Sequence, residues 1–306
     1  MSSEKLDLGF DRYPYSAIVD RPPYRWPSET GLAVYFALNI EAFEFGRNPG
    51  KDFTSMPTAP FARGYAYRDY GNRVGAWRIK KLFDDFGIPL AILANGSVYD
   101  VCPRVLEGFR ERGDEFVGHG RTNSERQIDM EQTREREMIR EVSEKMLKAE
   151  GVRPRGWLGP FISQSATTPE LLKELGFSYM LDWYFDEQPM WFRTDNGPIL
   201  AVPYPSMEMN DLPAYMNRGV SDSDFTKMLI DTFDEQLEEA QHAPLVYAVS
   251  LHTFTTGHPQ RIRELRKVLT HIAARRDEIW LTTPGAIAEH VTNLPPGTVP
   301  GDERDQ

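Results

Sequence analysis

The strongest constraint on the fold is an almost continuous apolar run from Leu32 to Ile40, followed by a regular alternation of strand-like and helix-like segments. A run that is apolar on both faces is typical of a parallel strand covered by helices on both sides. The alternation predicts right-handed βαβ units and a parallel sheet. The expected strands are 32–40, 89–94, 115–118, 156–158, 179–182, 200–203, 245–251 and 279–282. The expected helices are 75–86, 101–112, 130–149, 169–175, 222–240, 259–274 and 284–291.

Seven or eight such units in 306 residues predict an α/β fold, namely a single distorted (β/α) barrel of seven or eight strands that spans residues 1–306. A proline-rich arm, residues 1–30, precedes the barrel and is expected to be extended on a surface. The Pro/Gly/acid-rich tail 293–306 is expected to be flexible. Segment 46–64 is predicted to be a long loop that shapes the pocket together with segment 204–215.

Composition excludes several classes of function. The chain has 35 Lys and Arg against 46 Asp and Glu, a net charge of -11, so nucleic-acid or anionic-membrane partners are not expected. The single cysteine, Cys102, cannot form an internal disulfide and excludes a cysteine-based metal cluster. The amino terminus carries acids where a signal peptide needs bases, and no apolar stretch is long enough to span a membrane. We therefore expect a cytoplasmic protein.

Polar side chains stand where the predicted strands end, which is where a (β/α) barrel places its chemistry. Asn39 and Glu41 are two apart in a strand, so both are expected to point toward the barrel mouth. The predicted catalytic residues from four separate strand ends are Glu41, His119, Asp182 and His252. Alternative interpretations stay open: Glu41 as a loop cap, Asp182 as an acceptor for backbone amides, and the nearby aromatic residues as core.

Longer motifs accompany these strand ends. They are Tyr70-Gly71-Asn72-Arg73-Val74-Gly75-Ala76-Trp77-Arg78-Ile79, Gly257-His258-Pro259-Gln260-Arg261, Pro22-Pro23-Tyr24-Arg25-Trp26-Pro27, and Val202-Pro203-Tyr204 with Asn210-Asp211. Together they resemble the polysaccharide deacetylase (NodB-homology) superfamily and, within it, the metal-independent allantoinase and cyclic-imidase branch. The resemblance covers nearly the whole chain. It implies a NodB-like barrel, hydrolysis of a small cyclic amide and assembly as a homo-oligomer, with the aromatic arm as an interface element.

Departures from the metal-dependent members of that superfamily concern the metal ligands. Those members use an acidic motif on the first strand and a His-x-x-x-His pair on the third. Here His119 is followed by Asn123, and Asn39 and Glu41 stand at the acidic motif. An amide is a poor ligand for Zn²⁺, so we expect no metal and no cofactor, with weak Zn²⁺ binding by Glu41, His119 and Asn123 as the alternative. The arginine of the third sugar-family motif is also missing from 157–161, which argues against an acetamido-sugar substrate.

The predicted reaction is hydrolysis of a C–N bond in a small cyclic amide or imide of the allantoin, hydantoin or succinimide type. Glu41 is the expected base, with its pKa raised by Phe36, Phe43 and Trp157. His252 is expected to protonate the departing nitrogen, with Asp182 orienting its ring.

The remaining predicted residues bind the substrate. His119, Asn39 and Asn123 are expected to donate hydrogen bonds to the developing oxyanion. Trp157, Phe161 and Trp183 are expected to wall the pocket. Two other functions stay open on this sequence: a metal-dependent carbohydrate N-deacetylase, and a non-catalytic barrel that binds a small ligand.

Overall fold

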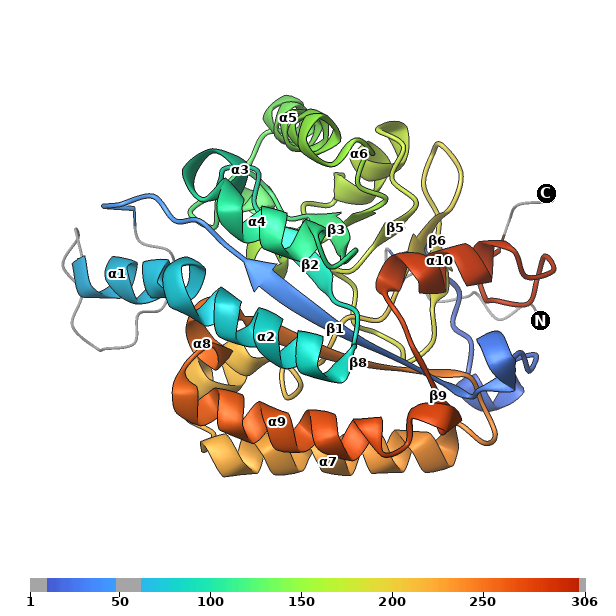
Figure 1. Cartoon of the computed structure of the whole chain (residues 1–306). Helices are drawn as coiled ribbons and strands as arrows, with labels where there is room; N and C mark the ends of the chain where they lie inside the picture. The colour runs from blue at the N-terminus through green and yellow to red at the C-terminus, as the bar shows by residue number, and fades with distance from the viewer. Residues whose placement is uncertain (1–9, 48–61, 303–306) are drawn as a thin grey trace.

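A curled, mostly parallel sheet forms the centre of the computed structural model, which describes residues 10–47 and 62–302 (Figure 1). Within these residues the sheet has nine strands in the order β6-β7-β5-β4-β3-β2-β1-β8, with β9 also paired to β1. The strands are β1 (Leu32–Ile40), β2 (Ala91–Ala94), β3 (Glu115–Gly118), β4 (Gly156–Trp157), β5 (Tyr179–Met180), β6 (Met190–Phe192), β7 (Ile199–Ala201), β8 (Leu245–His252) and β9 (Ile279–Leu281). The predicted α/β fold with a mostly parallel sheet is confirmed, and the curled sheet forms a half-barrel.

Helices cover the outside of the sheet on two sides (Figure 1). In that view α2, α9 and α7 lie below the long strands β1 and β8, and α3 to α6 lie above them. The α-helices are α1 (Ala62–Tyr70), α2 (Ala76–Phe86), α3 (Val98–Val101), α4 (Pro103–Arg110), α5 (Gln132–Glu150), α6 (Thr168–Glu174), α7 (Asp222–Glu239), α8 (Thr253–Thr256), α9 (Pro259–Ala273) and α10 (Pro284–Thr292).

Strand β1 organises the sheet because both of its edges are occupied. One edge pairs with β8 along residues 32–39. The other edge pairs with β2 along residues 37–40 and with β9 along residues 32–34. These ladders are parallel, and the antiparallel pair is β6 with β7. Strand β6 was not predicted, since a three-residue edge strand gives too short an apolar run to recognise.

The side chains of β1 alternate between two cores. Ala33, Tyr35 and Ala37 point into the barrel and pack in one buried cluster. Phe36 and Leu38 point outward and pack in another, under the helices. This two-sided burial is the physical reason for the nearly continuous apolar run. Asn39 and Glu41 continue the inward set, which carries them to the mouth of the barrel.

The part of the segment before α2 that the structure describes, from Ala62 onward, is helical. Most of the predicted loop 46–64, residues 48–61, lies outside the described residues. From Ala62 the chain is helical through α1, the π-helical turn η3 (Gly71–Gly75) and α2. A Cβ on Gly75 would overlap with the carbonyl oxygen of Thr253, which follows His252. The glycine therefore lets this helix lie directly against the end of β8.

The arm and the tail are docked on the barrel where they are described. Trp26 is buried, and its Nε1–H donates to the carbonyl oxygen of Leu245 at 3.0 Å. The guanidinium of Arg21 forms an ion pair with Asp186. In the tail, Val299 is buried and the carbonyl of Pro300 accepts from the backbone N–H of Trp191 at 3.0 Å. Up to residue 302 the tail is therefore packed against the sheet.

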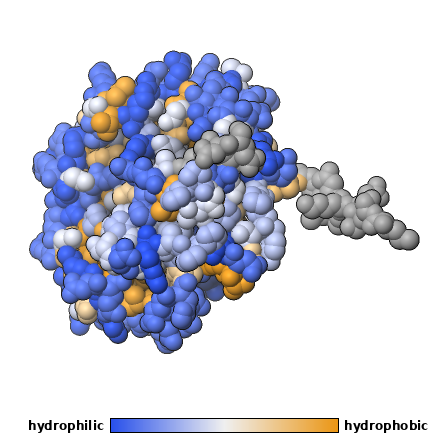
Figure 2. Space-filling model, turned by 90° about the vertical axis from the view of Figure 1, so that its right-hand side faces the viewer, coloured by the Kyte–Doolittle hydropathy of each residue, from blue (hydrophilic) through white to orange (hydrophobic). Residues whose placement is uncertain are grey.

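The outer surface is mainly polar. Figure 2 shows a hydrophilic face on which hydrophobic residues form small, scattered patches. Among the described residues, no helix combines the length and the apolar character that crossing a bilayer requires.

Candidate active site

A cavity of about 690 Å³ opens at the carboxyl ends of the strands, and we call it the mouth cavity. Most of the predicted site residues line it together with aromatic side chains. The lining includes Asn39, Glu41, Phe43, Arg68, His119, Asn123, Leu158, Phe161, Asp182, Tyr204, His252 and Phe254. Chain segments that are far apart in the sequence thus contribute to one site, as expected for this fold.

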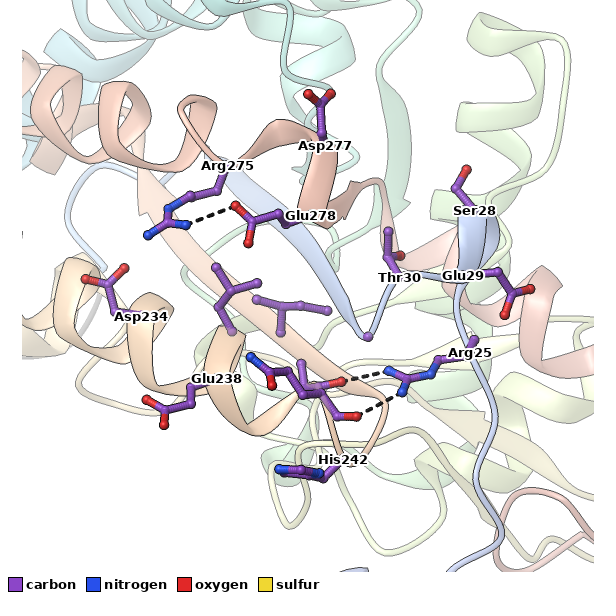
Figure 3. A pocket seen from close by; sticks show the side chains of 15 residues that line it. Arg25, Ser28, Glu29, Thr30, Asp234, Glu238, His242, Arg275, Asp277 and Glu278 are labelled. Carbon is purple, nitrogen blue, oxygen red and sulfur yellow. Dashed lines mark hydrogen bonds and ion pairs between the residues drawn. The ribbon is translucent and has the colours of Figure 1, made fainter.

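A second hollow, of about 790 Å³, lies at the opposite end of β1 and has a highly charged lining (Figure 3). Its two arginines already have partners. The guanidinium of Arg25 donates to the carbonyls of Ala240 and Gln241, both at 2.9 Å, and Arg275 pairs with Glu278 at 3.0 Å. Because chemistry in parallel α/β folds occurs at the carboxyl ends of strands, the mouth cavity is the candidate active site.

Glu41 is at the centre of the mouth cavity and is 3% exposed. Its Oε1 lies 3.3 Å from Nε2 of His119 and 3.6 Å from Nε2 of His252. Its Oε2 has no hydrogen-bond partner among the described residues. Burial alone raises the pKa of Glu41, but His252, His119 and Arg68 outweigh it and hold this pKa below its ordinary value. The carboxylate is therefore ionised at neutral pH.

The predicted apolar setting of Glu41 is wrong in two of its three residues. Phe43 lines the cavity, but Phe36 packs against Phe83 on the outer face of the sheet. Trp157 is buried in the core cluster that contains Met138 of α5. The expected rise in the pKa of Glu41 is wrong as well, because two imidazoles and a guanidinium, not aromatic rings, dominate its surroundings.

His252 is held by Asp211, not by Asp182 as predicted. Asp211 Oδ1 lies 2.7 Å from Nδ1 of His252. Its Oδ2 accepts from the backbone N–H of His252 at 2.9 Å and from the hydroxyl of Thr256 at 2.5 Å. Burial lowers the pKa of His252, but Asp211 and Glu41 outweigh burial and raise it above its ordinary value. The ring is thus oriented with Nε2 toward Glu41 and is biased toward its protonated form.

Asp182 lines the same cavity but holds a turn. Both of its carboxyl oxygens lie 3.0 Å from the backbone N–H of Gly159, as in the alternative interpretation of this residue. Burial raises the pKa of Asp182 to about 7, and the hydrogen bond from Gly159 opposes that rise. The turn after Gly159 carries Phe161 at a φ of 60° and Ile162 at a φ of 53°. Asp182 therefore supports a strained turn that presents Phe161 to the cavity.

His119 and Asn123 follow β3 and both reach the cavity. Nδ1 of His119 lies 2.8 Å from the carbonyl oxygen of Leu158, so this nitrogen carries a proton and Nε2 is directed at Glu41. Asn123 Oδ1 accepts a hydrogen bond from Asn95 at 3.1 Å. The side-chain N–H groups of Asn123 are consequently available to the cavity.

The predicted oxyanion donor Asn39 is already engaged. Its Nδ2 donates to Ser250 Oγ at 3.0 Å and to the carbonyl of Leu251 at 3.1 Å. Ser250 Oγ in turn lies 2.5 Å from the hydroxyl of Tyr204. Asn39 therefore ties β1 to β8 beneath the cavity instead of offering its N–H groups to a substrate.

Of the three predicted aromatic walls, Phe161 lines the mouth cavity and the two tryptophans do not. The indole N–H of Trp157 donates to Gln127 Oε1 at 2.9 Å under the helix layer. Trp183 donates to Gln164 Oε1 at 2.7 Å, and its ring packs near Phe192. In β4 and its extension it is Leu158 that points inward, so the alternation of side chains turns Trp157 outward.

Two residues of the candidate site were missed by the sequence interpretation. Asp211 stands in a motif that the resemblance includes, but no strand ends there to give it a role. Arg68 is buried on α1 and lies over the ring of Phe43, 5.0 Å from its centre. It follows the segment that was expected to be a loop, so its sequence context gave no signal of a site.

The donor set of the mouth cavity does not fit a transition metal. Among residues 10–47 and 62–302 no group of three or more His, Cys, Asp or Glu side chains is arranged to hold an ion. Glu41 and His119 offer ligand atoms, but the oxygen of Asn123 is turned toward Asn95. The remaining amide N–H of Asn123 is a hydrogen-bond donor and not a ligand.

The protein is a NodB-like half-barrel. Its candidate site, one carboxylate between two imidazoles, lies at the carboxyl ends of the strands. Comparisons with known proteins agree, although no family model matches the chain. The chain is similar over most of its length to proteins of the polysaccharide deacetylase superfamily.

The individual similarities extend over almost the full chain. A Schizosaccharomyces pombe protein that carries a polysaccharide deacetylase name is 29% identical, over 89% of this chain and 92% of its own. The crystal structure of PuuE allantoinase is 28% identical, with a TM-score of 0.81 over 93% of this chain and 97% of its own. A structure from Pseudomonas aeruginosa PAO1 that carries a polysaccharide deacetylase name is 26% identical, with a TM-score of 0.79 over 91% and 97%.

Proposed function

We propose that this protein hydrolyses a C–N bond of a small cyclic amide or imide, of the allantoin, hydantoin or succinimide type, without a metal ion. The observation that carries the proposal is the arrangement around Glu41. Its Oε1 lies between two imidazoles and its Oε2 has no partner among the described residues. An ionised carboxylate with one vacant oxygen is suited to accept a proton from a water molecule.

Each step of the reaction has a side chain to serve it. Glu41 Oε2 takes a proton as the water oxygen bonds to the substrate carbonyl carbon, and the electron pair of the C=O bond moves to its oxygen. The side-chain N–H groups of Asn123 and the imidazole of His119 donate hydrogen bonds to this oxyanion. As the tetrahedral intermediate collapses and the C–N bond breaks, Nε2–H of His252 protonates the departing nitrogen. Asp211 keeps that imidazole charged and oriented.

The cavity and one comparison support a small, planar substrate. Phe43, Phe161 and Phe254 line a volume of about 690 Å³, and aromatic walls suit the faces of a planar ring. PuuE allantoinase, a similar structure, bears the name of an enzyme that acts on allantoin. Imide and hydantoin carbonyls are more electrophilic than those of simple amides, so a carboxylate base is sufficient to activate the water.

A carbohydrate N-deacetylase is the second candidate, because the yeast and Pseudomonas aeruginosa relatives carry a polysaccharide deacetylase name. The two functions differ in their need for metal. Treatment with a chelator, followed by assays of cyclic amides, imides and acetylated sugars with and without Zn²⁺ or Co²⁺, separates them. Turnover of a cyclic substrate by the metal-stripped protein supports the first function. Activity on acetylated sugars that returns only with metal supports the second.

The role of Glu41 is tested by Glu41→Gln. We expect kcat to fall about 10²- to 10⁴-fold with KM little changed, because the amide cannot take the proton from water. Glu44→Gln is the matched control, since Glu44 pairs with Arg47 and is not part of the cavity lining. Equal activity of Glu41→Gln and wild type would exclude Glu41 as the base, and absence of turnover by both would point to the non-catalytic barrel.

A further inference from the structure

Asn95 lies behind the mouth cavity, where the carboxyl ends of β1, β2 and β3 meet. It follows β2 directly and its side chain is completely buried. Its backbone N–H donates to the carbonyl of Ile40 at 3.2 Å. Asn95 is not part of the cavity lining, so it has no direct contact with a substrate. Any effect of Asn95 on the site must be transmitted through a neighbour.

The orientation of the Asn95 amide is fixed by two backbone groups whose polarity cannot be reversed. Its Oδ1 accepts from the backbone N–H of Ala42 at 2.9 Å. Its Nδ2 donates to the carbonyl oxygen of His119. With the oxygen on an obligate donor and the nitrogen on an obligate acceptor, the reverse orientation would lose both hydrogen bonds.

This orientation dictates that of Asn123. The remaining N–H of Asn95 Nδ2 donates to Asn123 Oδ1 at 3.1 Å. Asn123 is further held by its backbone N–H, which donates to the carbonyl of Ala42 at 2.9 Å. The side-chain oxygen of Asn123 therefore faces Asn95, and its Nδ2 faces the mouth cavity, without a protein partner in the described part of the chain. The cavity presents a donor where a metal site would need an oxygen.

We propose that Asn95 is a positioning residue that holds Asn123 as a hydrogen-bond donor to the substrate carbonyl and keeps its oxygen from serving as a metal ligand. The catalytic part of this inference rests on the proposed function. The part that concerns amide orientation does not, because it follows from hydrogen bonds within the protein.

Asn95→Asp is the sharpest test, since it keeps the size of the side chain and removes its N–H groups. One oxygen of the new carboxylate still accepts from the backbone N–H of Ala42. The other oxygen faces two hydrogen-bond acceptors, the carbonyl oxygen of His119 and Oδ1 of Asn123. The Asn123 amide then turns over to donate to that carboxylate, and its oxygen enters the cavity. We expect kcat to fall about 10²- to 10³-fold with KM little changed, as for loss of one oxyanion donor.

Titration with Co²⁺ tests the orientation without any substrate. In the metal-stripped protein, Asn95→Asp should bind Co²⁺ at least about tenfold more tightly than wild type, because Glu41, His119 and the turned Asn123 oxygen now converge. The matched control is Asn72→Asp, since Asn72 is also a buried asparagine and donates to the carbonyl of Glu41 at 2.7 Å. Equal Co²⁺ affinity of Asn95→Asp and wild type overturns the inference, even if the proposed hydrolysis is confirmed.

A double-mutant cycle with Asn123→Leu separates positioning from a merely structural role. If Asn95 acts through Asn123, the loss of kcat caused by Asn95→Asp should shrink to less than about threefold in the Asn123→Leu background. An equal loss in both backgrounds contradicts the inference. Should Asn95→Asp fail to fold, Asn95→Ala enters the same cycle, since it releases the Asn123 amide without burying a charge.

Discussion

At the residue scale, the site depends on the electrostatic interaction between the Glu41 carboxylate and the two imidazoles beside it. Glu41 and His252 shift each other's pKa in the direction that the reaction needs: the base is held ionised and the acid is held protonated. Activity should therefore rise with pH below the ordinary pKa of a glutamate and fall only above the ordinary pKa of a histidine, with a broad optimum between these limits.

Asp211→Asn tests the alkaline limit of that range. Asp211 raises the pKa of His252, so removing its charge lowers that pKa, and the protonated imidazole is lost at a lower pH. We expect the alkaline limb of the kcat/KM profile to move to lower pH while the acid limb stays in place. Profiles between pH 4 and 10 measure the shift, with the exposed Asp231→Asn as control. An unmoved alkaline limb would mean that a group other than His252 controls it.

At the scale of elements, short strands and one close-packed helix position the site. Strands β4 and β5 contain two residues each, so the ends of neighbouring segments, and not long ladders, orient Asp182 and the turn after Gly159. The end of β8 is located by the helix that contains η3, because Gly75 lies against Thr253 and Gly257. The packing of this helix thus controls the residue that follows His252.

Gly75→Ala should disturb that contact. The added methyl group meets backbone atoms, which cannot move aside as a flexible side chain can, so we expect a loss of about 1–3 kcal/mol in the free energy of unfolding and a lower kcat. Gly87→Ala, at the other end of α2, is the control. There is space for its methyl group, but the φ of 59° makes alanine cost about 1 kcal/mol, with no effect on kcat. Denaturant titration and steady-state kinetics measure both, and an active, stable Gly75→Ala protein would contradict the proposed contact.

The sequence predicted the elements well and the directions of side chains less well. Most strands and helices could be recognised because apolar periodicity records burial directly. A strand buried on both faces carries no information on which side faces the cavity, so Trp157 was assigned to the site in place of Leu158. Asp211 contacts His252 only through the fold of the chain after β7, and Arg68 follows a segment without apolar pattern. Neither position could be derived from local spacing.

At the scale of the whole molecule, the amino-terminal arm packs into the core of the barrel. Trp26 is 1% exposed and packs in the inner cluster, so its removal leaves a large void at the end of the sheet. Trp26→Ala should lower the free energy of unfolding by about 3–5 kcal/mol, as measured by denaturant titration. Tyr15→Ala, at a position that is 95% exposed, should change it by less than about 0.5 kcal/mol. Similar effects of the two substitutions would mean that the arm contributes little to stability.

Several predictions about the whole molecule stay predictions: assembly as a homo-oligomer, a cytoplasmic location, and the absence of a metal, of a cofactor and of nucleic-acid or membrane partners. Light scattering coupled to size exclusion measures the first of these directly.

The two occupied edges of β1 also bear on how the protein is made. β1 leaves the ribosome long before its partners β8 and β9 are synthesised. Until then the nascent polypeptide holds an apolar strand with an unpaired edge, a state that invites association with other chains. Closure of the sheet therefore waits until β8 has been synthesised, and chains interrupted before Leu245 should depend strongly on chaperones.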